Sequence, residues 1–265
     1  MPNDSFSTVG LIVETIDHVR VLTLSRPERR NALSPELLDA LRIALDDAAS
    51  DREVAALVIT AAGAEAFCAG ADMKAAAAGG RTASRSRGPM SGIYRNVHEM
   101  ILELPKPTIA AVNGVAAGGG AEIALACDIR ICDPAARFIL PEAKRGMGAN
   151  FATVILPRLI PATHAFEMLY LGEPMDAGEA LRVGLVSHVT EPGGVRAKAL
   201  AMASRIATHA PLSLRRMKET MVKASGLPVS AALRLNEGLS PYESEDRIEG
   251  FRAFTEKRAP KWSGR

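Results

Sequence analysis

The segment that decides the fold is Gly114-Val115-Ala116-Ala117-Gly118-Gly119-Gly120-Ala121-Glu122, and a second segment of the same kind is Phe67-Cys68-Ala69-Gly70-Ala71-Asp72-Met73-Lys74. Each places small residues where a strand is expected to turn into a helix. Small side chains leave the backbone N–H groups of the first helical turn uncovered, so these groups can bind a negatively charged oxygen. Two such turns that face each other would form an oxyanion hole.

The sequence around these segments predicts alternating strands and helices. Continuous apolar runs are typical of buried strands, and strands are expected at residues 11–13, 19–24, 54–60, 108–112, 128–132 and 137–139. Apolar residues at helical spacing predict helices at residues 35–50, 93–104, 119–126, 162–171, 176–183, 195–209, 213–224, 228–237 and 241–258. Ser34-Pro35 and the capping box Ser240-Pro241-Tyr242-Glu243 mark two of the helix starts. The alternation favours an α/β fold.

The composition limits the class of protein. The chain has 265 residues, of which 48% are hydrophobic and 23% charged, and it is long enough to bury a large core. A formal net charge of +2 and an aromatic content of 4% provide neither the basic face nor the stacking surface of nucleic-acid binding. The polar segment Met1–Gly10 has no apolar centre, and no apolar run approaches membrane-spanning length. We therefore expect a cytoplasmic protein that binds neither nucleic acid nor membrane.

Several kinds of site are excluded by their motifs. Cys68, Cys127 and Cys132 lack C-x-x-C spacing, so reduced thiols are expected. The five histidines share no ligand spacing, so no metal site is expected and each histidine is assigned to the surface or to a satisfied core position. G-x-G-x-x-G, Walker A and G-x-S-x-G motifs are absent, and this argues against dinucleotide, nucleoside-triphosphate and serine-hydrolase chemistry.

Two glutamates remain as candidates for chemistry. Glu122 and Glu142 each adjoin an expected N–H-rich turn within an otherwise apolar stretch. Taken singly, each is a common acid at a helix entry, where it complements the helix dipole. Together they could hold one water molecule between them and pass protons to and from a bound substrate. The pair therefore indicates acid–base chemistry beside the oxyanion hole.

The order of short motifs along nearly the whole chain resembles the crotonase (enoyl-CoA hydratase/isomerase) superfamily. The motifs are Arg26-Pro27, Asn31-Ala32, Ala69-Gly70-Ala71-Asp72, Lys106-Pro107, Asn113-Gly114, Gly118-Gly119-Gly120 with Glu122, Cys127-Asp128, Pro141-Glu142 and Leu156-Pro157-Arg158. The resemblance implies a crotonase-like spiral of ββα turns in residues 1–195 and a helical oligomerisation region in residues 196–265. It also implies a homotrimer, or a hexamer formed as a dimer of trimers.

The resemblance also implies roles for individual residues. Ala71 and Gly119 would donate the two N–H groups that bind the thioester oxygen. Glu122 would deprotonate a water that adds to a 2-enoyl-CoA, and Glu142 would handle the proton at the α-carbon of the 3-hydroxyacyl-CoA product. Coenzyme A is then part of the substrate, and no separate cofactor is needed. The residues expected to contact it are Arg29, Arg30, Ala69, Asp72, Met73 and Lys74, with Phe254 and Lys257 from a neighbouring subunit.

Some alternatives stay open at this point. A Δ3,Δ2-enoyl-CoA isomerase needs the same oxyanion hole but can work with one carboxylate, so the presence of both acids favours the hydratase. Another crotonase-family acyl-CoA reaction, or a non-catalytic acyl-CoA-binding subunit, is also compatible with the fold. The segment Gly146–Thr153 departs from the glycine-rich turn of many hydratases, which leaves the acyl chain open. The segment Ala75–Gly92 is expected to be either a surface loop or a lid.

Overall fold

The structure, a computed structural model, describes residues 7–72, 95–235, 238 and 240–265. Its strands are β1 Leu11–Ile16, β2 Val19–Leu24, β3 Ala56–Ala61, β4 Ala66–Cys68, β5 Thr108–Val112, β6 Val115–Ala117, β7 Ile129–Cys132, β8 Arg137–Ile139, β9 Met175–Asp176 and β10 His188–Val189. Its α-helices are α2 Pro35–Ser50, α5 Val97–Leu102, α6 Gly119–Ala126, α7 Asn150–Leu159, α8 Ala162–Leu171, α9 Ala177–Arg182, α10 Val195–Ala207, α11 Pro211–Ala224, α12 Val229–Ala232 and α13 Glu245–Glu256.

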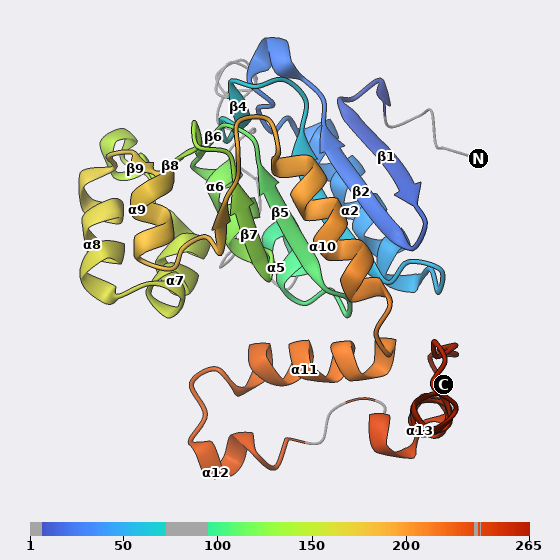
Figure 1. Cartoon of the computed structure of the whole chain (residues 1–265). Helices are drawn as coiled ribbons and strands as arrows, with labels where there is room; N and C mark the ends of the chain where they lie inside the picture. The colour runs from blue at the N-terminus through green and yellow to red at the C-terminus, as the bar shows by residue number, and fades with distance from the viewer. Residues whose placement is uncertain (1–6, 73–94, 236–237, 239) are drawn as a thin grey trace.

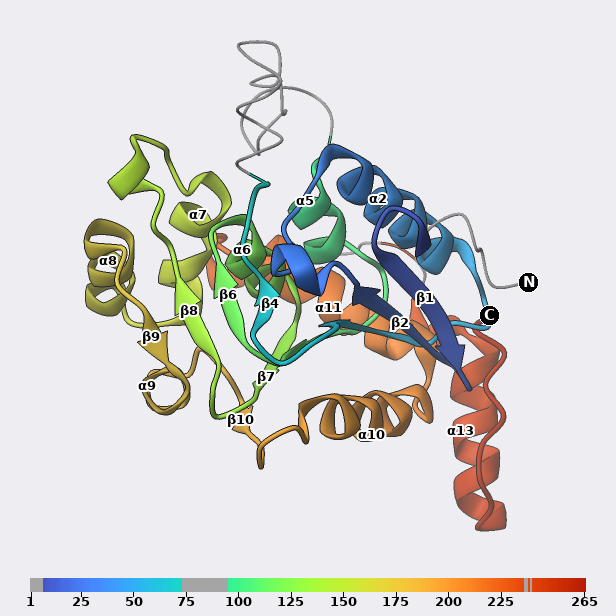
Figure 2. The same ribbon diagram turned by 90° about the horizontal axis from the view of Figure 1, so that it is seen from above.

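Within the described ranges the strands form two mixed sheets, and the predicted α/β fold is confirmed (Figures 1 and 2). One sheet has the order β1-β2-β3-β5-β7-β10, and the other has the order β4-β6-β8-β9. The pairs β3/β4, β5/β6 and β7/β8 each send one strand to each sheet, and α5, α6 and α7 follow them along the chain. This is the repeated ββα arrangement that the resemblance implies.

The core has two parts, one on each face of the larger sheet. Leu57 and Ile59 of β3 face the helices α2, α5 and α6 and the smaller sheet, whereas Val58 faces the opposite side. On that side Val195, Ala199 and Ala203 of α10 are buried against the strands. Figure 1 shows α10 lying across the sheet and α11, α12 and α13 extending below it. Alternate strand residues therefore fill both cores, as the period of a strand requires.

A buried lysine ties α11 to the core. The Lys218 side chain is 8% exposed, and its Nζ lies 3.0 Å from Asp128 Oδ2 and 3.0 Å from the carbonyl oxygen of Lys106. Burial lowers the pKa of the Lys218 ammonium, and the nearby Asp128 carboxylate opposes that shift. A buried charge needs such partners, because an unpaired one costs several kcal/mol. The ion pair thus fixes where the C-terminal helices leave the body of the protein.

Several predicted helix limits differ from the structure. The helix expected from Ile93 begins at Val97, because the Asn96 side chain caps it and Glu99 completes a capping box. The last helix begins at Glu245, where Ser244 Oγ accepts a hydrogen bond from Arg247 N–H. Pro241–Glu243 form a separate 3-10 turn, so the capping box predicted at Ser240 is wrong. Competing serine caps one turn apart cannot be ranked by sequence alone.

The short strands β4, β6, β9 and β10 and the helix α7 were not predicted. Strand β6 has only three residues, and its pairing with β4 and β8 stabilises it more than its alanine-rich composition does. Helix α7 contains Pro157, which disfavours a helix by propensity, yet the burial of Phe151, Ala152 and Leu156 holds it. The helix expected at 228–237 is shorter in the structure, which has α12 at Val229–Ala232. None of the helices in the described part of the chain has the length and apolar character to cross a membrane.

Candidate active site

Three neighbouring parallel strands end at one edge of the smaller sheet. Strand β4 pairs with β6, and β6 pairs with β8, all in parallel. The residues that follow them are the turn Ala69–Asp72 after β4, the turn at Gly118 after β6, and Glu142 after β8. Because the carboxyl ends of parallel strands meet at the same edge, the sheet brings both predicted turns and one predicted acid together.

The two turns face each other closely. Gly70 has φ +86°, and a Cβ built on it would lie 2.7 Å from the carbonyl oxygen of Ala117 and 3.5 Å from the nitrogen of Gly119. A glycine is therefore required at this position, both for its backbone conformation and for the space. The contact places the predicted first turn directly beside the start of α6.

The N–H groups of both predicted oxyanion donors, Ala71 and Gly119, have no hydrogen-bond acceptor among the described residues. A bridge joins Leu33 to Ala71, and its bonds run from Leu33 N–H to Gly70 O at 2.8 Å and from Asp72 N–H to Leu33 O at 3.0 Å. These bonds use the residues on either side of Ala71, so the Ala71 N–H stays outside the pair. Gly119 is the first residue of α6, where an N–H has no partner within the helix. Two such N–H groups beside each other can bind a developing oxyanion.

Glu122 is buried in the first turn of α6, with its side chain held at one oxygen. The residue is 7% exposed, and its Oε1 accepts a hydrogen bond from Ala152 N–H at 3.0 Å. Burial raises the pKa of the Glu122 carboxyl, and the N–H groups of Ala152 and Phe151 oppose this rise. Helix α7, which the sequence analysis missed, therefore supplies the donors that orient this acid. Its first residues belong to the departing segment Gly146–Thr153.

Glu142 lies at the end of β8 with one carboxyl oxygen against the second turn. A Cβ built on Gly118 would lie 2.8 Å from Glu142 Oε1, and Gly118 has φ 52° and ψ −127°, which only glycine adopts readily. Glu142 Oε2 is buried and has no hydrogen-bond partner among the described residues. Burial raises the pKa of the Glu142 carboxyl, and the charge of Glu122 raises it further. An unsatisfied buried oxygen of this kind is available to a substrate or a water.

His98 also lies at this site, although the sequence analysis assigned it no chemistry. Its Nε2 is 3.1 Å from the carbonyl oxygen of Gly119 and 3.9 Å from Glu122 Oε2. Its ring packs against Phe151 of α7, with the ring centroids 5.4 Å apart. Burial lowers the pKa of the imidazole to about 4. No sequence motif around His98 predicts this position, because only the packing of α5 against α6 brings His98 close to Glu122.

The residues expected to contact coenzyme A fall into two groups. The loop with Arg29 and Arg30 lies beside the first turn, because Ala69 N–H donates to the Arg30 carbonyl at 3.0 Å, and both arginines are exposed. Asp72 Oδ2 lies 3.2 Å from the guanidinium of Arg26, which the sequence analysis did not connect to this turn. Met73 and Lys74 lie outside the described residues, as does the segment 75–92.

The second group lies far from this edge of the sheet. Phe254 is 86% exposed on α13, and Lys257 ends that helix with a left-handed backbone. Both views show α13 well apart from α6 (Figures 1 and 2). One chain therefore does not bring Phe254 and Lys257 to its own Glu122, and the predicted role of these two residues requires a neighbouring copy.

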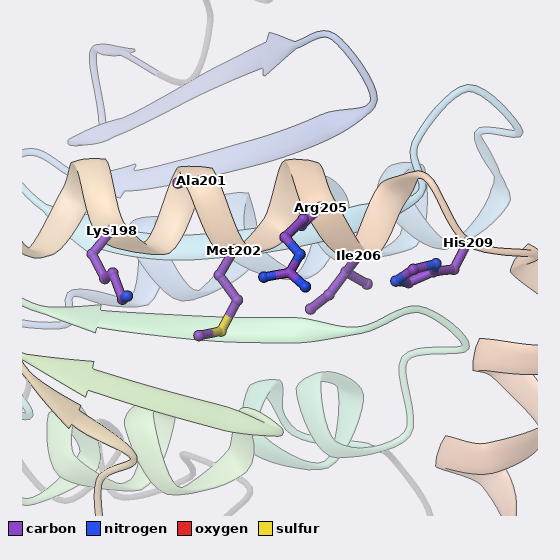
Figure 3. Close-up of a pocket in the computed structure, with 6 residues that line it drawn as sticks. All are labelled: Lys198, Ala201, Met202, Arg205, Ile206 and His209. Carbon is purple, nitrogen blue, oxygen red and sulfur yellow. The ribbon is translucent and has the colours of Figure 1, made fainter. Parts of the chain in front are cut away.

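A separate hollow lies along α10. It has a volume of about 350 Å³, and the residues that line it all come from this helix and its C-terminal end. Figure 3 shows them as Lys198, Ala201, Met202, Arg205, Ile206 and His209. None of the predicted site residues lines this hollow, so it is not part of the candidate active site.

Comparisons with known proteins found related sequences and structures. The family model described as Enoyl-CoA hydratase/isomerase matches residues 14–265. The chain is 40% identical over 261 residues to the (E)-benzylidenesuccinyl-CoA hydratase of Thauera aromatica, with 95% of this chain and 98% of that protein covered. It is 39% identical over 251 residues to the carnitinyl-CoA dehydratase of Salmonella typhi, with 92% and 94% covered. The crystal structure of an enoyl-CoA hydratase from Bacillus anthracis matches with a TM-score of 0.89 at 34% identity, covering 97% of this chain and 100% of that one.

Proposed function

The chain belongs to the enoyl-CoA hydratase/isomerase family, and from that membership we propose that it adds water to a 2-enoyl-CoA thioester to form a 3-hydroxyacyl-CoA. One arrangement carries the proposal: the buried Glu122 and the half-buried Glu142 both adjoin the turn at Gly118 and Gly119. Gly70, the neighbour of Ala71, packs against the same turn. A hydratase needs both acids, whereas an isomerase can shuttle one proton with a single carboxylate. The relatives named a hydratase and a dehydratase catalyse the two directions of such a reaction.

The oxyanion hole activates the thioester. The N–H groups of Ala71 and Gly119 bind the carbonyl oxygen, and the N-terminus of α6 adds its positive dipole. Electron density then moves from the double bond toward this oxygen, so the β-carbon becomes electrophilic and an enolate forms as water attacks. The bond between the water oxygen and the β-carbon forms while the carbon–carbon double bond is lost.

The two carboxyls divide the proton transfers. Glu122, ionised and held at Oε1 by Ala152 N–H, takes one proton from the attacking water. Glu142, whose pKa is raised by burial and by the charge of Glu122, delivers a proton to the α-carbon from its protonated form. The proton on Glu122 then returns to Glu142, and the product keeps the second water proton as its hydroxyl. Two neighbouring acids, one ionised and one protonated in this mechanism, are suited to this exchange.

We also propose that the active form is a homotrimer or a dimer of trimers, with residues 196–265 at the interface. Helices α11 to α13 expose large apolar side chains that a single chain leaves uncovered: Met217, Met221, Val229, Leu233, Ile248, Phe251 and Phe254. Phe254 and Lys257 would then reach the coenzyme A bound by a neighbour, beside Arg29 and Arg30. Light scattering coupled to gel filtration measures the oligomer, and an active monomer would contradict this proposal.

The decisive test follows the oxygen of water. Wild-type protein is supplied with 2-enoyl-CoA thioesters of short, branched, aromatic and carboxylated acyl chains in ¹⁸O-labelled water. We expect labelled 3-hydroxyacyl-CoA, and we expect Glu122→Gln and Glu142→Gln each to lower hydration by ~10²–10⁴. The double variant should be little worse than the poorer single variant, because the two acids act as a unit. Conjugation of 3-enoyl-CoA without incorporated label, with Glu122→Gln tolerated, would favour an isomerase instead.

A further inference from the structure

The oxyanion turn carries a run of three glycines, so its rigidity must come from bonds outside the turn. Glycine has more conformational freedom than any other residue, and a flexible donor stabilises a transition state poorly. Gly118 N–H donates to Ile139 O at 2.9 Å, which fixes the turn on the side of β8. On the opposite side, the carbonyl of Gly119 meets the imidazole Nε2 of His98 at 3.1 Å.

The hydrogen on the His98 ring can be placed from this contact. A carbonyl oxygen only accepts, so Nε2 must carry the hydrogen and Nδ1 must be the bare nitrogen. Nδ1 is buried and has no partner among the described residues, which agrees with a group that has no hydrogen to donate. Because burial lowers the pKa of this imidazole to about 4, the ring stays uncharged at neutral pH.

The Nε2–H group of His98 also lies near the carboxylate of Glu122. Glu122 Oε2 lies 3.9 Å from His98 Nε2, which is too long for a hydrogen bond but close enough for the N–H dipole to favour the carboxylate. The other oxygen, Oε1, is held by Ala152 N–H. The charged groups around the ring are Glu99 on its own helix and Glu122 on α6, and the charge of Glu122 in turn raises the pKa of Glu142.

We propose that His98 is a positioning residue for the hydration reaction: its Nε2–H holds the Gly119 peptide, and with it the orientation of the oxyanion donor, and its dipole favours the charged form of the nearby Glu122 carboxylate. This inference rests on the proposed function. His98 does not touch the reacting atoms in this role, and the contact with Phe151 keeps its ring in place from the side of α7. His98 of α5 thus contacts α6 through its Nε2–H and α7 through its ring.

Three substitutions separate the hydrogen bond from the packing. His98→Phe keeps a planar ring beside Phe151 but removes the donor. His98→Gln carries an amide N–H near the former Nε2, and His98→Asn carries one near the former Nδ1. Steady-state kinetics with the best 2-enoyl-CoA substrate are measured between pH 5 and 9, and circular dichroism and light scattering check the fold and the oligomer of each variant.

We expect His98→Phe to lower kcat about 10-fold, the effect of one lost hydrogen bond, with KM changed less than about 2-fold. The acid limb of its pH profile should move upward, because the carboxylate of Glu122 loses a favourable dipole. His98→Gln should recover most of the lost rate, whereas His98→Asn should resemble His98→Phe. Equal loss in all three folded variants, or a wild-type rate in His98→Phe, would overturn the proposal.

A spectroscopic measurement tests the hydrogen position without using activity. In protein labelled with ¹⁵N-histidine, two-dimensional NMR should show the His98 hydrogen on Nε2 from pH 8 to pH 5, with the signal assigned by its loss in His98→Gln. A hydrogen on Nδ1, or a charged ring at pH 6, would refute the inference. If wild type hydrates none of the thioesters, the proposed function has failed. If wild type is active and His98→Phe is unimpaired, only the role of His98 has failed.

Discussion

Substitution of Gly118 by alanine tests the geometry that holds Glu142 against the oxyanion turn. The new Cβ would lie 2.8 Å from Glu142 Oε1, about 0.6 Å inside ordinary van der Waals contact. The carboxyl must move by a comparable distance, and displacements approaching 1 Å at a reacting group can cost ~10²-fold in rate. We therefore expect kcat to fall by about 10- to 100-fold.

The same substitution also strains the backbone. Gly118 has φ 52° and ψ −127°, a conformation that costs a residue with a side chain about 1–3 kcal/mol. For a chain of this size, that loss lowers the melting temperature by about 2–12 °C. Gly184→Ala is the matched control, because Gly184 has φ +81° and nothing within 4 Å of its Cβ position. It should lose stability without losing kcat.

The assay compares the hydration rate and the melting temperature of the wild type and both variants. Rates are measured well below each melting temperature, so that only folded protein is compared. A Gly118→Ala protein that is folded and oligomeric yet keeps the wild-type kcat would refute the reasoning. So would a Gly184→Ala protein with the same loss of kcat, because the effect would then follow stability rather than the position of Glu142.

Three further outcomes are expected. Gly119→Pro removes one N–H donor from the oxyanion hole, so turnover should fall by ~10²–10³, and near wild-type turnover of folded protein would show that the hole lies elsewhere. Burial raises the pKa of both acids, so both limbs of the pH profile of kcat/KM should lie above the ordinary carboxyl pKa of 4.5. The folding stability that the protonated carboxyls contribute is fully present below pH 4.5, and it is lost as the pH rises through the pKa of the folded state. Glu142→Gln cannot ionise, so at pH 8 it should melt no lower than wild type. If the melting temperature of the variant, relative to that of wild type, is lower at pH 8 than at pH 5, the direction of the pKa shift is contradicted. Lys218→Met leaves Asp128 without its buried partner and should cost about 2–3 kcal/mol in a denaturant titration; an unchanged midpoint would show that Lys218 does not tie α11 to the core.

The sequence by itself determined the elements whose signals are local. Helix α2 begins at Pro35 as predicted, because the Ser34 side chain caps Leu37 N–H, and its residues Leu37 and Leu41 are buried. Strand β5 matches its apolar run Thr108–Val112 residue for residue. The alternation of strands and helices predicted the α/β fold class, and the order of short motifs indicated the family. The limits of α2 and β5 depend on hydrogen bonds and burial periods within one segment, so a single segment is enough to show them.

The tertiary structure alone decided which residues meet. Strands β4, β6 and β8 bring the turns at Gly70 and Gly118 to Glu142, but nothing in the sequence states that these strands are neighbours. His98 reaches Gly119 through the packing of two helices. Ala152, in the first turn of α7, donates a hydrogen bond to Glu122, although α7 contains Pro157 and was not predicted. Contacts between distant segments depend on strand order and helix packing, and a site built from them has no signature in any one segment.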